Sequence, residues 1–264
     1  MPDSLLEVAL NASINAGKAI LKVYSNEKIE SELKQDKSPL TLADKNAHDE
    51  ICKILKSTNI PILSEEGLNI PYSERKNWEL LWIVDPLDGT KEFINRNGDF
   101  TVNIALIQNN FPVLGVVFIP VKGLFYYGTK GKGAFRSEVH GVKCPEDILN
   151  NSVRIPVSET ARPYTVVASR SHMNDETTTY IKNMEAEKGV IQFISRGSAL
   201  KICMVAEGSA DVYPRFGPTM EWDTAAGHAV ALEAGCRFTQ ADGITPVKYN
   251  KEDLLNPYFI VKMK

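Results

Sequence analysis

The sequence predicts a layered α/β protein with two lobes, a sheet-rich first lobe and a second lobe in which strands and helices alternate. Three observations support this fold class. The first half contains short apolar runs bounded by turn residues. The second half alternates such runs with segments of helical periodicity. The length of 264 residues, with 43% hydrophobic content, is sufficient for one domain over residues 1–264.

The first lobe opens with two predicted helices. Apolar residues recur at helical spacing near the N-terminus, at Leu5, Leu6, Ala9, Ala16, Ile20 and Val23. The polar stretch KQDKSP, residues 34–39, follows, and its proline disfavours continuation of a helix. The segment LADKNAHDEICKILK, residues 42–56, then returns to helical spacing. We therefore expect two helices separated by a polar loop.

Five apolar runs after the second helix predict strands. They are IPILS, LLWIVD, FTVNIALI, VLGVVFIP and GLFYYG. The links QNNFP and VKG are too short for a crossover connection, so the middle strands are expected to be antiparallel neighbours.

The second lobe begins near Tyr164. We expect the strand YTVVAS, a helix over 175–188, the strand VIQFIS, the helix GSALKICMVAEG, a short segment ADVYP and the helix WDTAAGHAVALEAG, ended by Gly235. The polar segment 138–157 is the predicted boundary, which places the lobes at about 1–150 and 151–264.

Composition excludes several classes of protein. A net charge of -3 and a pI near 5.9 argue against a general binder of nucleic acid polymers. The N-terminus lacks a basic region before an apolar core, and no apolar run is long enough for a transmembrane segment. The four cysteines show no metal-binding spacing and are expected to be buried, reduced thiols. We expect a soluble cytoplasmic protein; the sequence leaves the oligomeric state and peripheral membrane association open.

The stretch WIVDPLDGTKEF, residues 82–93, ends a predicted strand with two carboxylates, Asp85 and Asp88. Mg²⁺ prefers oxygen ligands on rigid elements, and the Leu87 carbonyl belongs to the same turn. Gly89 and Thr90 offer backbone N–H groups and a hydroxyl to phosphate oxygens. The alternative is a simple strand-ending Asp-Pro turn with a side-chain cap.

Further acids follow other predicted elements: Glu65 and Glu66 end a strand, Asp223 begins a helix, and Asp44 lies one turn after Thr41. Each has a structural alternative. Thr41 and Asp44 match a capping box, Asp223 is favourable near a helix dipole, and the glutamates are compatible with a solvated pair. Together, four acidic turns at the ends of elements favour a shared metal site.

The motifs LSEE, WIVDPLDGTKEF and EWDTAAGHAV, in this order, resemble the lithium-sensitive, magnesium-dependent phosphatases of the inositol monophosphatase superfamily. DKSPLTLAD, NGDFTVNIALI, SRSH and VAEGSADVYPRFGPT make the resemblance closer to the CysQ-type 3'(2'),5'-bisphosphate nucleotidases. It extends over about 34–257. It implies an αβαβα sandwich, one catalytic domain, with the site between the lobes.

By position, the resemblance implies two or three Mg²⁺ ions per site. Their ligands would be Glu65, Asp85, the Leu87 carbonyl, Asp88 and Asp223. Asp44 and Thr90 would orient and deprotonate the attacking water, with Glu65 assisting through its metal. Gly89 and Thr90 would bind phosphate, and Glu66 would support the ligands. Asp36, in the polar loop, is a candidate water-mediated contact to a further metal; the alternative is a solvated loop acid.

Substrate choice depends on other residues. Inositol enzymes carry an acid shortly before the Trp-Asp pair, where this chain has Arg215 in YPRFGPT, and a small residue where it has Lys201. A second phosphate on adenosine would explain these cations. His172 of SRSH is then expected against the adenosine, with Ser198, Lys201 and Arg215 toward the phosphate that is not cleaved. The alternatives are a strand-capping His172, a solvated Lys201 and an Arg215 in a surface ion pair.

The leading expectation is hydrolysis of the small molecule 3'-phosphoadenosine 5'-phosphate to AMP and phosphate, with 3'-phosphoadenosine 5'-phosphosulfate and the 2',5' isomer as further candidates. This would remove a by-product of sulfate assimilation, and lithium should inhibit it. One alternative is an inositol or sugar phosphatase. Another is a non-catalytic, metal-dependent nucleotide sensor. A calcium module is disfavoured because no EF-hand loop is present.

Overall fold

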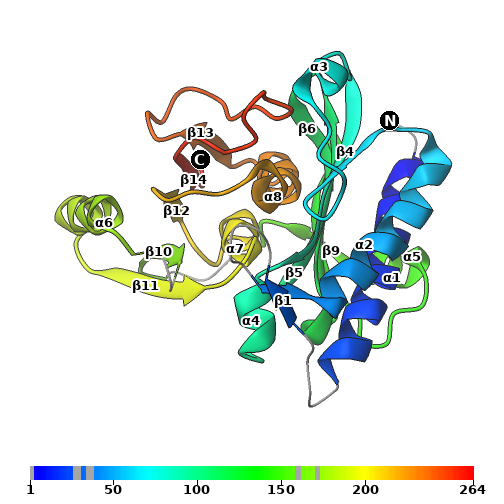
Figure 1. Ribbon diagram of the computed structural model, residues 1–264. Coiled ribbons are helices and arrows are strands. Elements are labelled where there is room, and N and C mark those ends of the chain that lie inside the picture. The colour runs from blue at the N-terminus through cyan, green and yellow to red at the C-terminus, as the bar shows by residue number, and fades with distance from the viewer. Residues whose placement is uncertain (1–2, 26–30, 34–38, 158–161, 170–172) are drawn as a thin grey trace.

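A computed structural model describes residues 3–25, 31–33, 39–157, 162–169 and 173–264. Figure 1 shows five layers: a pair of helices, a large sheet, a second pair of helices, a smaller sheet and an outer helix. The expected αβαβα sandwich is therefore confirmed. Residues 34–38 lie outside the described residues, and with them Asp36 and its predicted contact to a metal.

The first helical layer consists of α1 (Asp3–Tyr24) and α2 (Leu42–Leu55), both close to their predicted bounds. Their apolar faces pack on one face of the large sheet, in a core that includes Leu10, Ile20 and Ile51. The short strands β1 (Ser31–Leu33) and β2 (Pro39–Thr41) pair antiparallel before α2. This packing fixes the start of α2, where Asp44 lies.

The large sheet has seven strands in chain order: β3 (Ile62–Ser64), β4 (Leu80–Asp88), β5 (Thr101–Gln108), β6 (Phe111–Ile119), β7 (Leu124–Thr129), β8 (Gly133–Glu138) and β9 (Ser152–Ile155). All neighbours are antiparallel except β3 and β4. The predicted antiparallel order of the middle strands is confirmed. Strands β8 and β9 were not predicted, and β9 extends the sheet to Ile155, within the segment expected to separate the lobes.

Short helices connect these strands: η1 (Lys56–Thr58), α3 (Tyr72–Arg75), α4 (Thr90–Ile94), η2 (Pro120–Lys122) and α5 (Pro145–Asn150). Of these, α4 is important for the site because it begins immediately after the Asp-Gly pair that ends β4.

The second lobe contains β10 (Tyr164–Ser169), α6 (Asp175–Lys188), β11 (Ile191–Arg196), α7 (Leu200–Glu207), β12 (Val212–Arg215), α8 (Glu221–Glu233), β13 (Arg237–Gln240) and β14 (Phe259–Lys262). Its sheet has the order β11-β10-β12-β14-β13. Strand β10 is parallel to β11 and β12, and β14 is antiparallel to β12 and β13. Every predicted element of this lobe is confirmed, whereas β13 and β14 were not predicted.

Helix α8 lies between the two sheets and approaches the large sheet closely (Figure 1). A Cβ atom added to Gly115 on β6 would overlap the Ala226 carbonyl and lie 2.8 Å from Ala229 Cβ. Gly227 of α8 is similarly close to α7: a Cβ atom added to it would lie 3.0 Å from Ile202 Cδ1. Small residues on both elements therefore allow α8 to place its first turn beside the end of β4.

Within the described residues, no helix combines the length and apolar character that a membrane span requires. All four cysteines are free thiols, as expected. Cys203 and Cys236 are buried, but the expected burial is wrong for Cys52 and Cys144, which are half-buried.

Candidate active site

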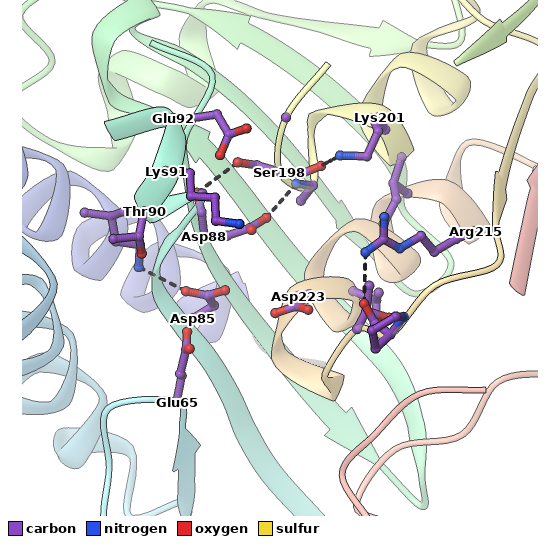
Figure 2. A pocket seen from close by; sticks show the side chains of 18 of the residues that line it. Glu65, Asp85, Asp88, Thr90, Lys91, Glu92, Ser198, Lys201, Arg215 and Asp223 are labelled. Atoms are coloured by element: carbon purple, nitrogen blue, oxygen red, sulfur yellow. Dashed lines mark hydrogen bonds between the residues drawn. The ribbon is translucent and has the colours of Figure 1, made fainter. Parts of the chain in front are cut away.

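A β-bulge turns Asp85 and Asp88 to the same face of the large sheet. Asp85 pairs with Asn103 of β5, but the next pair joins Asp88 to Thr101. Residues three apart on a regular strand point to opposite faces, and the extra residue in β4 cancels that reversal. Pro86 lies in the interruption, where no ladder N–H is required. Both carboxylates are therefore directed between the sheets (Figure 2).

Polar groups from both lobes orient Asp88. The Ala199 N–H donates to Asp88 Oδ2 at 2.7 Å. Thr101 Oγ1 and Asn103 Nδ2 contact the same oxygen, each at 3.4 Å. The partners of this carboxylate thus gather on one oxygen, a geometry that suits a cation bound at the other.

Asp85 and Asp223 each accept a hydrogen bond from a nearby backbone N–H. Leu87 donates to Asp85 Oδ1 at 3.0 Å. Met220 donates to Asp223 Oδ2 at 2.8 Å, so Asp223 does stabilise the start of α8. A carboxylate has two oxygens, and Asp223 also lines the cavity described below. Capping and ligand binding are therefore compatible for this residue.

Glu65 and Glu66 follow β3 but line different pockets. The Glu65 N–H donates to the Val84 carbonyl at 3.1 Å, which places this residue beside the end of β4. Its half-buried side chain lines the same cavity as Asp85. Glu66 lines a separate pocket with His48. The glutamates are thus not simply a solvated pair.

A cavity of about 310 Å³ lies between the lobes. It is lined by Glu65, Asp85, Leu87, Asp88, Gly89, Thr90, Lys91, Glu92, Gly197, Ser198, Ala199, Lys201, Ile202, Tyr213, Arg215, Pro218, Thr219, Asp223, Thr224 and Phe259. Figure 2 shows Glu65, Asp85 and Asp88 on one side, Lys201 and Arg215 on the other, and Asp223 between Asp85 and Arg215. The structure therefore combines acids and cations from segments far apart in the sequence.

The acids raise the pKa of one another. Burial raises the pKa of Asp85 well above its usual value, and repulsion from Glu65, Asp88, Asp223 and Asp44 adds to it. Burial and the charge of Asp88 likewise raise the pKa of Asp223. Burial raises the pKa of Asp88 to about 6, although Lys201 and the Ala199 N–H act in the opposite direction. Such crowding of buried negative charge calls for a bound cation.

The donor set fits Mg²⁺ better than a cation that requires a closed protein shell. In the part of the chain that the structure describes, no three His, Cys, Asp or Glu side chains converge closely enough to enclose an ion. Mg²⁺ commonly retains several waters and uses one or two carboxylates together with substrate phosphate. The cavity of about 310 Å³ that these hard oxygen donors line leaves room for both.

The residues expected to act on water occupy two elements. Asp44 is fully buried in the first turn of α2, close enough to Asp85 to raise its pKa, but is not among the cavity-lining residues. Thr90 opens α4 and lines the cavity. Gly89 precedes it with a φ of 92°, a left-handed conformation that glycine adopts without strain. The side chain of Thr41 lies outside the described set.

Lys201 and Arg215 are buried at the other side of the cavity, with 5% and 8% of their surface exposed. The predicted alternatives of a solvated lysine and a surface arginine pair are therefore wrong. Lys201 Nζ donates to the Ser198 carbonyl at 2.6 Å, and Arg215 Nη2 to the Pro218 carbonyl at 2.9 Å. Burial lowers the pKa of Lys201 to about 8, with the Asp88 charge opposing this shift.

Sequence reasoning missed several cavity residues. Lys91 and Glu92 follow the predicted phosphate turn on α4, and Tyr213 lies on β12 with Lys201 Nζ 5.5 Å from the centre of its ring. Their adjacency to the acidic turn and to Arg215 was the only available signal. His172, together with the rest of the SRSH motif beyond Ser169, lies outside the described residues.

Comparison with known proteins identifies the family. The family model for the inositol monophosphatase family matches residues 1–262. The chain is 48% identical to 3'(2'),5'-bisphosphate nucleotidase CysQ of Salmonella typhimurium over 260 residues, 97% of this chain and 99% of that protein. It is 45% identical to CysQ of Escherichia coli over 263 residues, 98% of this chain and 100% of that one.

A solved structure agrees. CysQ from Bacteroides thetaiotaomicron, a bacterial member of the inositol monophosphatase family, superposes with a TM-score of 0.90 at 50% identity, over 99% of this chain and 97% of that chain. The extragenic suppressor protein suhB from Bartonella henselae superposes with a TM-score of 0.76 at 25% identity, over 99% and 94% of the two chains. Fold, motifs and near-complete coverage agree: this chain belongs to the inositol monophosphatase family.

Proposed function

We propose that this chain is a Mg²⁺-dependent 3'(2'),5'-bisphosphate nucleotidase that hydrolyses 3'-phosphoadenosine 5'-phosphate to AMP and phosphate. The observation that carries the proposal is the pairing, in one cavity, of a carboxylate cluster with the buried cations Lys201 and Arg215. The similarity to nucleotidases named CysQ, over nearly the full length of both chains, supports the same substrate class.

Two or three Mg²⁺ ions would be held by Glu65, Asp85, the Leu87 carbonyl, Asp88 and Asp223. Bound Mg²⁺ supplies positive charge to the phosphoryl oxygens and acidifies a coordinated water. The protein's contribution is to fix the ligands at the ends of β3 and β4 and at the start of α8. Because the carboxylates are buried close to one another, their pKa values are raised, and a bound cation would stabilise their anionic forms.

The Thr90 hydroxyl would accept the proton of the attacking water as it passes its own proton to Asp44, which would then be the final acceptor. The cavity position of the Thr90 side chain supports contact with water, and the burial of Asp44 supports a role as the final acceptor. Gly89 and Thr90, at the first turn of α4, offer polar groups to the phosphate that is cleaved.

Lys201 and Arg215 would bind the phosphate that is not cleaved. Their buried charges are costly in the absence of an anion, and both lie on the side of the cavity away from Glu65. Ser198 lines the same wall, and His172 remains a prediction for the adenosine. The 5'-phosphosulfate and the 2',5' isomer are candidate additional substrates on the same reasoning.

The decisive experiment compares kcat/KM for 3'-phosphoadenosine 5'-phosphate with that for inositol 1-phosphate, at saturating Mg²⁺. A preference of at least about 100-fold for the nucleotide is expected, because a second charge-assisted phosphate contact is worth roughly 1.5–3 kcal/mol per bond. Equal turnover would favour the inositol phosphatase alternative. Tight binding of the nucleotide without turnover would favour the sensor alternative.

Lithium inhibition is a second expectation for this metal site. Millimolar LiCl should lower the rate in a manner that depends on the Mg²⁺ concentration, and KCl at equal ionic strength is the control.

A further inference from the structure

Ser198 lines the cavity, but its hydroxyl is already committed to the protein. Ser198 Oγ contacts the Asp99 carbonyl at 2.7 Å and the Asp88 carbonyl at 2.9 Å. The residue adopts a φ of 48°, in the left-handed region that non-glycine residues rarely enter. A strained conformation of this kind persists when surrounding contacts fix it.

Neighbouring atoms of the same segment reach both halves of the site. The next backbone N–H, that of Ala199, donates to the Asp88 carboxylate at 2.7 Å. The Ser198 carbonyl accepts from Lys201 Nζ at 2.6 Å. Ser198 and Ala199 thus contact Asp88 through its carbonyl and its carboxylate, and the Ser198 carbonyl contacts the buried Lys201.

The two glycines at this contact are required for its closeness. A Cβ atom on Gly89 would overlap Ser198 Oγ, and a Cβ atom on Gly197 would lie 2.7 Å from Glu92 Cγ. Asp99, the second acceptor of the Ser198 hydroxyl, is itself paired with Lys122 Nζ at 2.9 Å. The first-lobe side of this contact is therefore itself held in place by an ion pair.

We infer that Ser198 is a positioning residue that acts through Asp88 rather than a residue that binds the nucleotide. Its hydroxyl fixes the backbone of the metal-binding turn, and its left-handed conformation aims the Ala199 N–H at the Asp88 carboxylate. The inference rests on the proposed function, because it requires that Asp88 binds Mg²⁺. It revises the expectation that the Ser198 side chain faces the uncleaved phosphate.

The test uses Ser198→Ala, which removes the hydroxyl and keeps Cβ, and Ser198→Gly, which removes both but suits the positive φ. Mg²⁺ binding is measured by calorimetry without nucleotide, and kcat and KM are measured with 3'-phosphoadenosine 5'-phosphate across a Mg²⁺ series. We expect about a tenfold weaker Mg²⁺ affinity and a lower kcat for both variants, as for loss of a group that orients a metal ligand. The KM at saturating Mg²⁺ should change less than about threefold.

Ser209→Ala is the control. Ser209 follows the far end of α7, and its hydroxyl contacts only groups of that helix, the Glu207 carboxylate at 2.7 Å and the Met204 carbonyl at 3.2 Å, among the described residues. It should leave Mg²⁺ affinity and KM unchanged. Circular dichroism verifies that each variant is folded, and the Gly variant provides the measurement if Ala is incompatible with the backbone.

A raised KM with unchanged Mg²⁺ affinity would show that the hydroxyl binds substrate. It would overturn this inference but not the proposed function. Unchanged behaviour in both Ser198 variants would also overturn it. Failure of the unmodified protein to bind Mg²⁺ would instead contradict the proposed function.

Discussion

At the scale of single residues, the site depends on charges that are costly on their own. Asp85 is 1% exposed and lies among other acids, while Lys201 is buried at the opposite wall. Burial disfavours the charged form of each, so the pKa of Asp85 rises and that of Lys201 falls. Perturbed groups of opposite sign that share one cavity are typical of functional sites.

Replacing Asp88 by Asn should remove most of the activity while the protein remains folded. The amide keeps the shape and can still accept from the Ala199 N–H, but it loses the negative charge that a Mg²⁺ ligand supplies. We expect kcat to fall by about 100-fold or more. Steady-state kinetics across a Mg²⁺ series measures this, and near-normal kcat at saturating Mg²⁺ would remove Asp88 from the ligand set.

Replacing Lys201 by Ala should raise KM for 3'-phosphoadenosine 5'-phosphate by about 10- to 100-fold, the loss expected for one charge-assisted hydrogen bond. The KM for 3'-AMP, which lacks the second phosphate, should change much less. Lys130→Ala, at an exposed turn after β7, is the control. Equal effects on both nucleotides would place Lys201 away from the second phosphate.

At the scale of elements, two local irregularities shape the site. The bulge in β4 brings Asp85 and Asp88 to one face, and the close approach of α8 to β6 brings Asp223 to the same space. Both irregularities depend on a neighbouring element. A bulge exists only relative to its partner strand, and the close approach of α8 to β6 requires small residues on both elements.

Gly115→Ala tests the second of these. The added Cβ would overlap the Ala226 carbonyl, so α8 must shift, and overpacking of this kind costs about 1–3 kcal/mol. We expect a lower unfolding free energy in urea and a lower kcat, because Asp223 moves with its helix. Gly235→Ala, after the same helix, has no atom within 4 Å of its new Cβ and a φ of 88°. It should lose only about 1 kcal/mol and keep its activity; similar kinetics for both variants would contradict the proposed role of this contact.

At the scale of the whole molecule, the two lobes meet around a cluster of like charges, so folding and metal binding are linked. The pKa of Asp88 is about 6 in the folded protein, against about 3.9 in an unfolded chain. Its contribution to stability without metal is therefore fully present below the unfolded pKa and is lost as pH rises through about 6. The raised pKa values of Asp85 and Asp223 act in the same direction.

As the pH rises from 5 to 7.5, Tm should accordingly fall more in EDTA than in Mg²⁺. At pH 7.5, Mg²⁺ at about 100 times its Kd contributes roughly 2.7 kcal/mol, or about 5–10 °C at 2–4 °C per kcal/mol. At pH 5 the gain should be smaller, because protonated carboxylates bind Mg²⁺ weakly. Scanning calorimetry with KCl at equal ionic strength measures this, and a Mg²⁺ effect independent of pH would argue against the acid cluster as the binding site.

The sequence by itself determined most elements and the identity of the acids. Helical spacing located α1 and α2, because an amphipathic face is written in the order of the residues. The motif around Asp85 indicated a metal site because it places two carboxylates and a glycine turn at the end of a predicted strand. Strands β1, β2, β8, β9, β13 and β14 were missed; their stability comes from neighbouring strands, a context that outweighs local propensity.

Only the tertiary structure decided how these residues meet. No local pattern predicts that β4 bulges opposite β5, that Lys201 is buried, or that the Ser198 hydroxyl lies within hydrogen-bonding distance of two carbonyls of the other lobe. Each of these follows from contacts between segments far apart in the chain. The physical reason is that burial and hydrogen-bond partners, unlike helical periodicity, are properties of the packed lobes and not of any single stretch of sequence.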